Sequence, residues 1–137
     1  REMAEHGKKY AVQIIANAKA LGQALADEGV TVEAQEFGFT ASHQLALNVT
    51  NFGNAKDIAR SLAEKSNIIT NFNMLPWDKD ARNPSGLRIG VQEMTRYGMK
   101  EAEMGELASL MKAGLEGKSV KDEVTKLRSR FTDVHFS

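Results

Sequence analysis

The spacing of apolar and polar residues predicts a helix at the start of the chain. Between Ala11 and Leu25, apolar residues recur every three or four positions, which is the pattern of an amphipathic helix. Gly29 follows where a left-handed residue commonly ends a helix. The polar stretch before Ala11 can continue the helix backwards, so we expect it to cover about residues 1–28.

The rest of the chain predicts strands interleaved with further helices. Strands are expected over residues 30–33, 44–49, 68–70 and 87–91, with Leu45, Leu47 and Val49 on one face of the second. The expected helices are one capped by Asn54 and ended by Asn67, one broken by Gly114 and Gly117, and one capped by Ser119. Residues 71–84 read as a loop. This order favours an α+β fold, with a small, mainly antiparallel sheet and helices packed on one face.

Composition restricts the classes of function. The 137 residues suffice for a single domain over 1–137 with one core. The 18 basic and 18 acidic residues cancel, so we expect no nucleic-acid or membrane partner. Without cysteine there is no thiolate chemistry, which fits the reducing cytoplasm where we place the protein. Because the chain begins with the polar run after Arg1, we expect a fragment of a longer polypeptide.

The candidate chemistry lies in the run from Asn83 to Gly90. It places Arg88 inside an apolar, strand-like stretch just after a Pro/Gly turn. Burying an arginine is costly unless an anion meets it, and the guanidinium fork suits a carboxylate. One interpretation is that Arg88 receives the carboxylate of a small acid. The other is a structural ion pair with an Asp or Glu of the chain itself.

Five segments carry sequence motifs in a fixed order. They are Asn17-Ala18-Lys19-Ala20-Leu21, Thr40-Ala41-Ser42-His43, Asn71-Phe72-Asn73 with Pro76 and Asp78, Ser85-Gly86-Leu87-Arg88-Ile89-Gly90, and Thr95-Arg96-Tyr97-Gly98. Together, from about Tyr10 to Phe131, they resemble the C-terminal small domain of serine hydroxymethyltransferase, with its TDNH, NKN…P.D, SG(I/L)R(I/V)G and TRRG motifs. That family has fold type I and uses pyridoxal phosphate. The resemblance implies that residues 1–28 are the helix leading in from a large domain.

The resemblance also assigns roles to two residues. In the family, the arginine matching Arg88 binds the α-carboxylate of serine or glycine, and the asparagine matching Asn73 contacts the reduced pterin. The implied reaction interconverts serine and glycine with one-carbon transfer to that pterin. The Schiff-base lysine and the phosphate-binding loop belong to the large domain, so we expect no catalytic residue here and no activity from the isolated chain. The full-length protein is expected to be a homodimer.

Several departures from the family motifs leave alternatives open. Gly90-Val91-Gln92-Glu93 replaces GTPA, and Phe72 replaces the lysine of NKN. These features resemble the archaeal branch, so tetrahydrofolate and tetrahydromethanopterin both remain candidates for the pterin. Alternative readings are another fold-type-I enzyme, aldolase-like or aminotransferase-like, and a free-standing, non-catalytic interaction module. The three histidines lack metal-ligand spacing, so no metal site is expected.

Overall fold

The computed structural model describes residues 2–136, and its elements follow the predicted order closely. They are α1 (Glu2–Asp27), β1 (Thr31–Val32), the 3-10 turn η1 (Gln35–Phe37), β2 (Gln44–Asn48), the 3-10 turn η2 (Thr50–Phe52), α2 (Ala55–Ser66), β3 (Asn71–Asn73), β4 (Gly86–Gly90), α3 (Gln92–Arg96), α4 (Glu101–Leu115) and α5 (Lys121–Ser129). Gly29 has φ 82°, so it ends the α1 region in the left-handed conformation expected of it.

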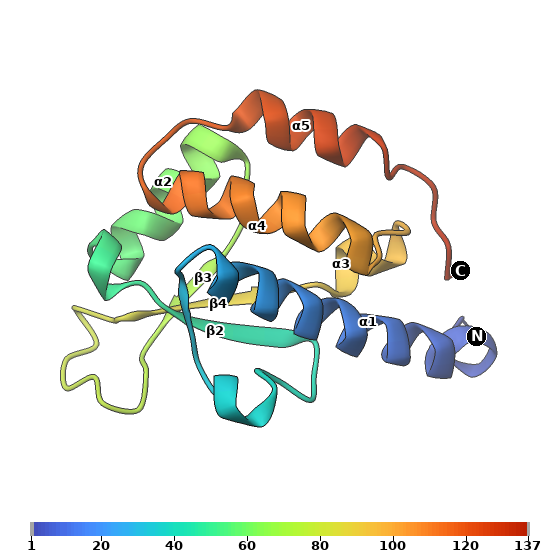
Figure 1. Cartoon of the computed structure of the whole chain (residues 1–137), viewed down its shortest axis with the longest axis horizontal. Helices are drawn as coiled ribbons and strands as arrows, with labels where there is room; N and C mark the ends of the chain where they lie inside the picture. The colour runs from blue at the N-terminus through green and yellow to red at the C-terminus, as the bar shows by residue number, and fades with distance from the viewer. Residues whose placement is uncertain (1, 137) are drawn as a thin grey trace.

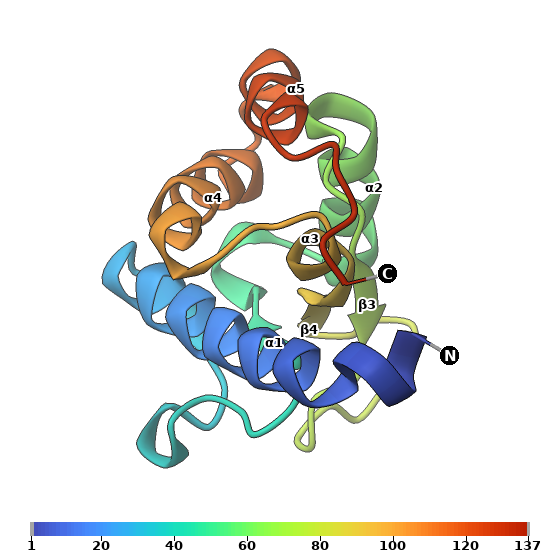
Figure 2. The same cartoon turned by 90° about the vertical axis from the view of Figure 1, so that its right-hand side faces the viewer.

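The strands form a sheet in the order β1-β2-β4-β3, and every neighbouring pair is antiparallel (Figure 1). Helices α1, α2 and α4 gather on the same side of this sheet, and α5 lies outermost (Figure 2). The predicted α+β class, with helices packed on one face of a mainly antiparallel sheet, is therefore confirmed.

Alternation along the strands decides which face of the sheet is covered. Leu45, Leu47, Leu87 and Ile89 point to the helices, and each is at most 7% exposed. They join Leu21 and Leu25 of α1 and the methionines of α4 in one apolar core. The intervening residues of β2 and β4 point to the opposite face, which no helix covers within residues 2–136. The sheet consequently has one apolar face and one open, polar face.

The third strand lies elsewhere than predicted. The expected strand at 68–70 is wrong, because Ile69 is 81% exposed and pairing begins only at Asn71. Asn71, Phe72 and Asn73 pair with Arg88, Leu87 and Gly86 along the edge of the sheet. The loop between β3 and β4 accordingly starts three residues later than expected.

Two predicted helix boundaries are also wrong. Gly114 does not break α4, which continues to Leu115; a Cβ at this glycine would stand 2.6 Å from Cδ2 of Leu62. The glycine thus lets α4 approach α2 closely. Ser119 does not cap α5. Its hydroxyl donates instead to the carbonyl oxygen of Lys65, whereas Asn54 caps α2 as predicted.

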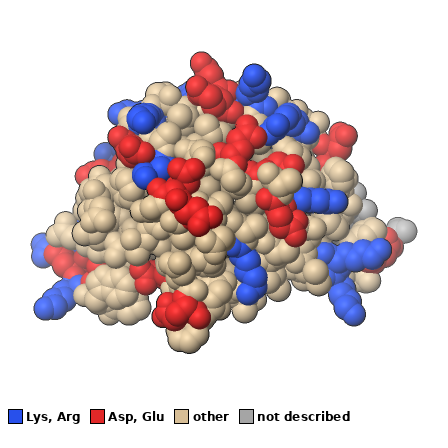
Figure 3. All heavy atoms as spheres, viewed as in Figure 1, with Lys and Arg blue, Asp and Glu red and all other residues tan. Residues whose placement is uncertain are grey.

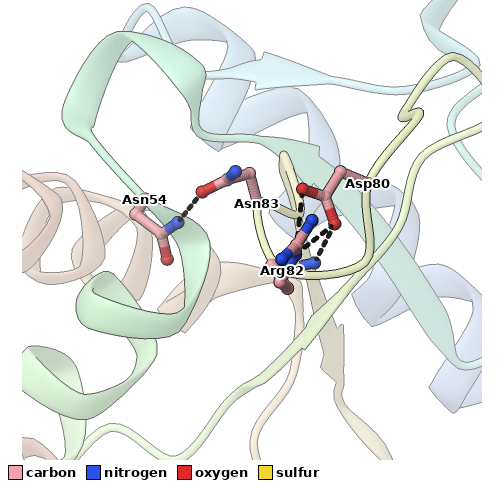
Figure 4. A network of polar contacts seen from close by, with 4 residues as sticks. All are labelled: Asn54, Asp80, Arg82 and Asn83. Carbon is pink, nitrogen blue, oxygen red and sulfur yellow. Dashed lines mark hydrogen bonds and ion pairs between the residues drawn. The ribbon is translucent and has the colours of Figure 1, made fainter.

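The loop between β3 and β4 contacts the start of α2 shortly before it enters β4. The Asn54 side chain that caps α2 also donates to Oδ1 of Asn83, at 3.4 Å (Figure 4). Beside this contact, Arg82 bonds both carboxylate oxygens of Asp80. The loop is therefore an ordered connection leading into β4.

The surface carries charges of both signs. On the face seen in Figure 3, acidic and basic side chains are interspersed over the helices rather than gathered into a field of one sign. Within residues 2–136, no helix combines the length and the apolar character needed to cross a bilayer.

Candidate functional site

The open face of the sheet brings together the two residues singled out from the sequence. Register places Arg88 between Ala46 of β2 and Asn71 of β3, and one row away Gly86 lies between Asn48 and Asn73. Residues paired across strands share a face, so these side chains all stand on the side away from the helices. Arg88 and Asn73 are diagonal neighbours on this face, which places them roughly 7–8 Å apart, with their Cβ positions somewhat closer.

Arg88 is exposed, which corrects the premise that its head is buried among apolar side chains. Its neighbours Leu87 and Ile89 are buried, because strand alternation sends them to the helices and Arg88 to the open face. None of the ion pairs found within residues 2–136 uses its guanidinium. The acids among the described residues thus leave the fork free for an external anion.

Glycines flank Arg88 on its own face. Gly86 and Gly90 are its second neighbours along β4, so they stand on the same side of the sheet. A Cβ at Gly86 would approach both the main-chain and the side-chain oxygen of Asn73 to 2.8 Å. The glycines therefore keep the surface beside the guanidinium low and allow β3 to lie close to β4.

Asn73 is held at the edge of this face with one polar atom unused. Its Nδ2 donates to the carbonyl oxygen of Met74 at 3.3 Å. Its Oδ1 is buried and has no hydrogen-bond partner among the described residues. An unpaired buried oxygen is unfavourable, so a donor from a ligand or a small rotation of this amide would be stabilising.

Asp78 closes the loop that leads into β4. Its Oδ2 accepts from the backbone N–H groups of Leu75 and Ser85, at 2.8 Å each, and its Oδ1 accepts from the Ser85 hydroxyl. These bonds, the Ser85 hydroxyl first, favour the ionised carboxylate and lower the pKa of Asp78 below its ordinary value of 3.8. The P.D and SG.R motifs therefore meet, and Asp78 fixes the start of the strand that carries Arg88.

A buried polar network lies at the other end of β4, and the sequence reasoning missed it. Asn17 and Thr95 are both 0% exposed, and Nδ2 of Asn17 donates to Oγ1 of Thr95 and to the carbonyl oxygen of Met99, at 2.8 Å each. Gln13 donates to Oδ1 of Asn17 and to Glu101. The signal was present, because Asn17 is a polar residue within the apolar stripe of the first helix.

Glu101 forms the outer end of this network. The pKa of its carboxyl is lowered, first by a hydrogen bond from its own backbone N–H and then by the Gln13 side chain. Glu101 therefore stays ionised at neutral pH and accepts from Gln13 at the surface.

The other features of the described residues do not indicate a second site on the open face. Met99, Met104 and Met111 are buried in the core, whereas Trp77 is 52% exposed in the loop after β3. No group of three or more His, Asp or Glu among residues 2–136 is arranged to hold a metal ion. An apolar cavity of about 320 Å³ lies between the helix side of β4 and helices α4 and α5, across the sheet from Arg88.

Comparison with known proteins decides the family. The sequence model of the family described as "Serine hydroxymethyltransferase" matches residues 1–111. The chain belongs to the serine hydroxymethyltransferase family. The resemblance found from the motifs is thereby confirmed.

Serine hydroxymethyltransferases of archaea are similar to this chain in sequence. That of Methanobrevibacter smithii is 50% identical over 139 residues, covering 99% of this chain and 33% of that protein. That of Pyrobaculum aerophilum is 46% identical, covering 98% of this chain and 32% of that protein. The chain thus spans about a third of the length of the curated relatives it matches.

A solved structure shares the fold as well. An L-threonine transaldolase from Pseudomonas fluorescens, crystallised in its internal aldimine state, superposes with a TM-score of 0.85 and 29% sequence identity. The match covers 99% of this chain and 32% of that one. This fold therefore also makes up about a third of an enzyme whose named activity is different.

Proposed function

We propose that this chain is the small domain of a pyridoxal-phosphate-dependent serine hydroxymethyltransferase that interconverts serine and glycine with one-carbon transfer to a reduced pterin. The proposal is carried by Arg88, which stands on the open face of the sheet and forms no ion pair with any acid whose side chain the structure describes. Membership of the family, shown over residues 1–111, supports it.

Arg88 acts by orientation. Two parallel N–H···O bonds from its fork fix both the position and the plane of the substrate carboxylate. Holding the carboxylate in one plane also sets which bond at Cα is aligned for cleavage. When bound, pyridoxal phosphate supplies the electron sink for the carbanion that forms at Cα.

The residues present fit a substrate carboxylate rather than the cofactor itself. The open face offers a free guanidinium, flanking glycines and the amides of Asn48, Asn71 and Asn73. We assign the Schiff-base lysine and the phosphate-binding loop to the part of the polypeptide that makes up the other two thirds of the relatives' length. On this proposal the isolated chain is inactive, and the full-length protein is a cytoplasmic homodimer.

Asn73 is proposed to contact the pterin. An amide presents a donor and an acceptor side by side, which matches the edge of a pterin ring. The Oδ1 of Asn73 is buried without a partner, so a rotation of this amide that brings Oδ1 to a ring N–H would satisfy it. Tetrahydrofolate and tetrahydromethanopterin share that edge, so the proposal includes both as candidates.

The test is Arg88→Lys in the full-length holoenzyme. A lysine keeps the charge but loses the fork, so we expect the dissociation constant for serine to rise roughly 10- to 150-fold. Arg82→Lys is the matched control, since Arg82 is 89% exposed in the preceding loop and pairs with Asp80. Near-normal serine affinity in Arg88→Lys would refute the assignment of Arg88 as the residue that binds the substrate carboxylate.

A second candidate is an aldolase-like or transaldolase activity of the same fold. The threonine transaldolase with a TM-score of 0.85 favours it. The two functions share the carboxylate-binding arginine but differ in their need for a pterin. Measuring serine cleavage by the full-length enzyme with and without each reduced pterin separates them.

A further inference from the structure

Asn17 is a polar side chain at a place where burial is otherwise apolar. It is 0% exposed within α1, beside core residues Ala18 and Leu21. A buried amide is tolerated only when its donors and acceptor are paired. Both Nδ2 protons are used, toward Thr95 and Met99, and Oδ1 accepts from Gln13 at 3.0 Å.

The bonds run in one direction from α1 to the end of β4. Gln13 donates to Asn17, Asn17 donates to the Thr95 hydroxyl, and that hydroxyl donates to the carbonyl oxygen of Val91 at 2.7 Å. A hydroxyl has a single proton, so accepting from Asn17 leaves that proton for the Val91 carbonyl. The chain of donors is therefore fully satisfied in one arrangement.

Val91 is the junction between the Arg88 strand and α3. It follows Gly90, the last residue of β4, and its N–H donates to the carbonyl oxygen of His43 at 3.2 Å, which continues the pairing of β2 with β4. The next residue, Gln92, begins α3. Fixing the Val91 carbonyl against α1 thus fixes the end of the strand three residues after Arg88.

We propose that Asn17 and Thr95 are positioning residues for substrate binding: through Val91 they hold β4 against α1 and so set where the Arg88 guanidinium stands. This inference rests on the proposed function of Arg88. The inference links two of the sequence motifs, because the segment that begins at Asn17 and the segment that begins at Thr95 each supply one residue of the network.

The test uses the full-length enzyme loaded with pyridoxal phosphate, titrated with glycine while the cofactor's visible absorption is followed. Thr95→Val removes the hydroxyl with little change in shape, and with it the bonds to Asn17 and to the Val91 carbonyl. We expect the dissociation constant for glycine to rise about tenfold. Thr95→Ser keeps the hydroxyl and is expected to restore affinity. Thr125→Val is the matched control, because Thr125 makes the same bond to a carbonyl four residues back, on exposed α5.

The route through Arg88 is tested by combining substitutions. In an Arg88→Ala background, Thr95→Val should change glycine affinity no further, since the group it positions is gone. If Thr95→Val weakens glycine equally with and without Arg88, or behaves like Thr125→Val in the wild-type background, the inference is overturned. If Arg88→Ala itself leaves glycine affinity unchanged, the proposed function fails, and the inference with it.

A milder variant covers the case in which Thr95→Val does not fold. Gln13→Leu removes the first donor of the chain at a half-buried position of α1. We expect glycine affinity to fall about threefold, because the Asn17 amide then loses one of its restraints. An unchanged dissociation constant in folded Gln13→Leu overturns the inference.

Discussion

Two glycines of α4 provide a sharp test of the packing between helices. Gly105 has open space where a Cβ would stand, whereas a Cβ at Gly114 would stand 2.6 Å from Cδ2 of Leu62. Alanine raises helix propensity at either position, by up to about 1 kcal/mol and less toward the helix end. Gly105→Ala should therefore stabilise the chain by about 0.5–1 kcal/mol.

Gly114→Ala is expected to lose that gain to overpacking. Leu62 is 0% exposed, so its methyl group has no solvent into which it can turn. Overpacking a filled core typically costs about 1–3 kcal/mol, which makes Gly114→Ala about 0–2 kcal/mol less stable than the parent. The two alanine variants should then differ by about 1–3 kcal/mol in the free energy of unfolding, measured by urea denaturation.

A double-mutant cycle identifies the clash as the cause. Leu62→Val shortens the opposing side chain, so in that background Gly114→Ala should approach the behaviour of Gly105→Ala. The coupling between positions 62 and 114 should be about 1–2 kcal/mol, within the range for residues in contact. Equal stability of Gly114→Ala and Gly105→Ala in the parent background would refute the close approach of α4 to α2.

Two further predictions concern the loop and the strand around Arg88. The pKa of Asp78 is lowered in the folded chain, so its contribution to stability is present above 3.8 and is lost as the pH falls through the lower folded value. Asp78→Asn should weaken the chain at neutral pH and flatten the loss of stability on acidification, measured by urea unfolding between neutral pH and about pH 2.5; an unchanged acid response would contradict this. Asn73→Ala should weaken pterin binding to the full-length enzyme about tenfold, as for one lost hydrogen bond, and leave glycine affinity unaltered; equal loss of both ligands, measured by titration, would count against a pterin contact.

The periodic elements could be predicted because burial imposes a period on the sequence. Leu45 and Leu47 alternate with polar or small residues since one face of β2 meets the helices, and the strand predicted over 44–49 is observed over Gln44–Asn48. The edge strand β3 lacks such a signal, because Asn71-Phe72-Asn73 is held by backbone pairing with β4 rather than by burial. Ile68 and Ile69 are typical strand residues, and they account for the wrong prediction of a strand over 68–70.

The sequence singles out Arg88 as a candidate site residue but does not predict its surroundings. Arg88 was found from its apolar neighbours, yet those neighbours are buried on the other face of the sheet. Which face the helices cover depends on contacts between distant segments, such as α1 with α4, and local sequence does not encode them. The role of Thr95 likewise depends on Asn17, which lies 78 positions away.

Both edge strands of the sheet are short. The outer strands β1 and β3 comprise two and three residues, while the inner strands β2 and β4 have five each. A long, flat margin offers unpaired N–H and C=O groups to any passing strand and invites aggregation. Because β1 and β3 present so few consecutive main-chain groups, they are poor templates for pairing with a strand of another chain. A polar sheet face can therefore stay open for a ligand without the sheet recruiting further chains at its sides.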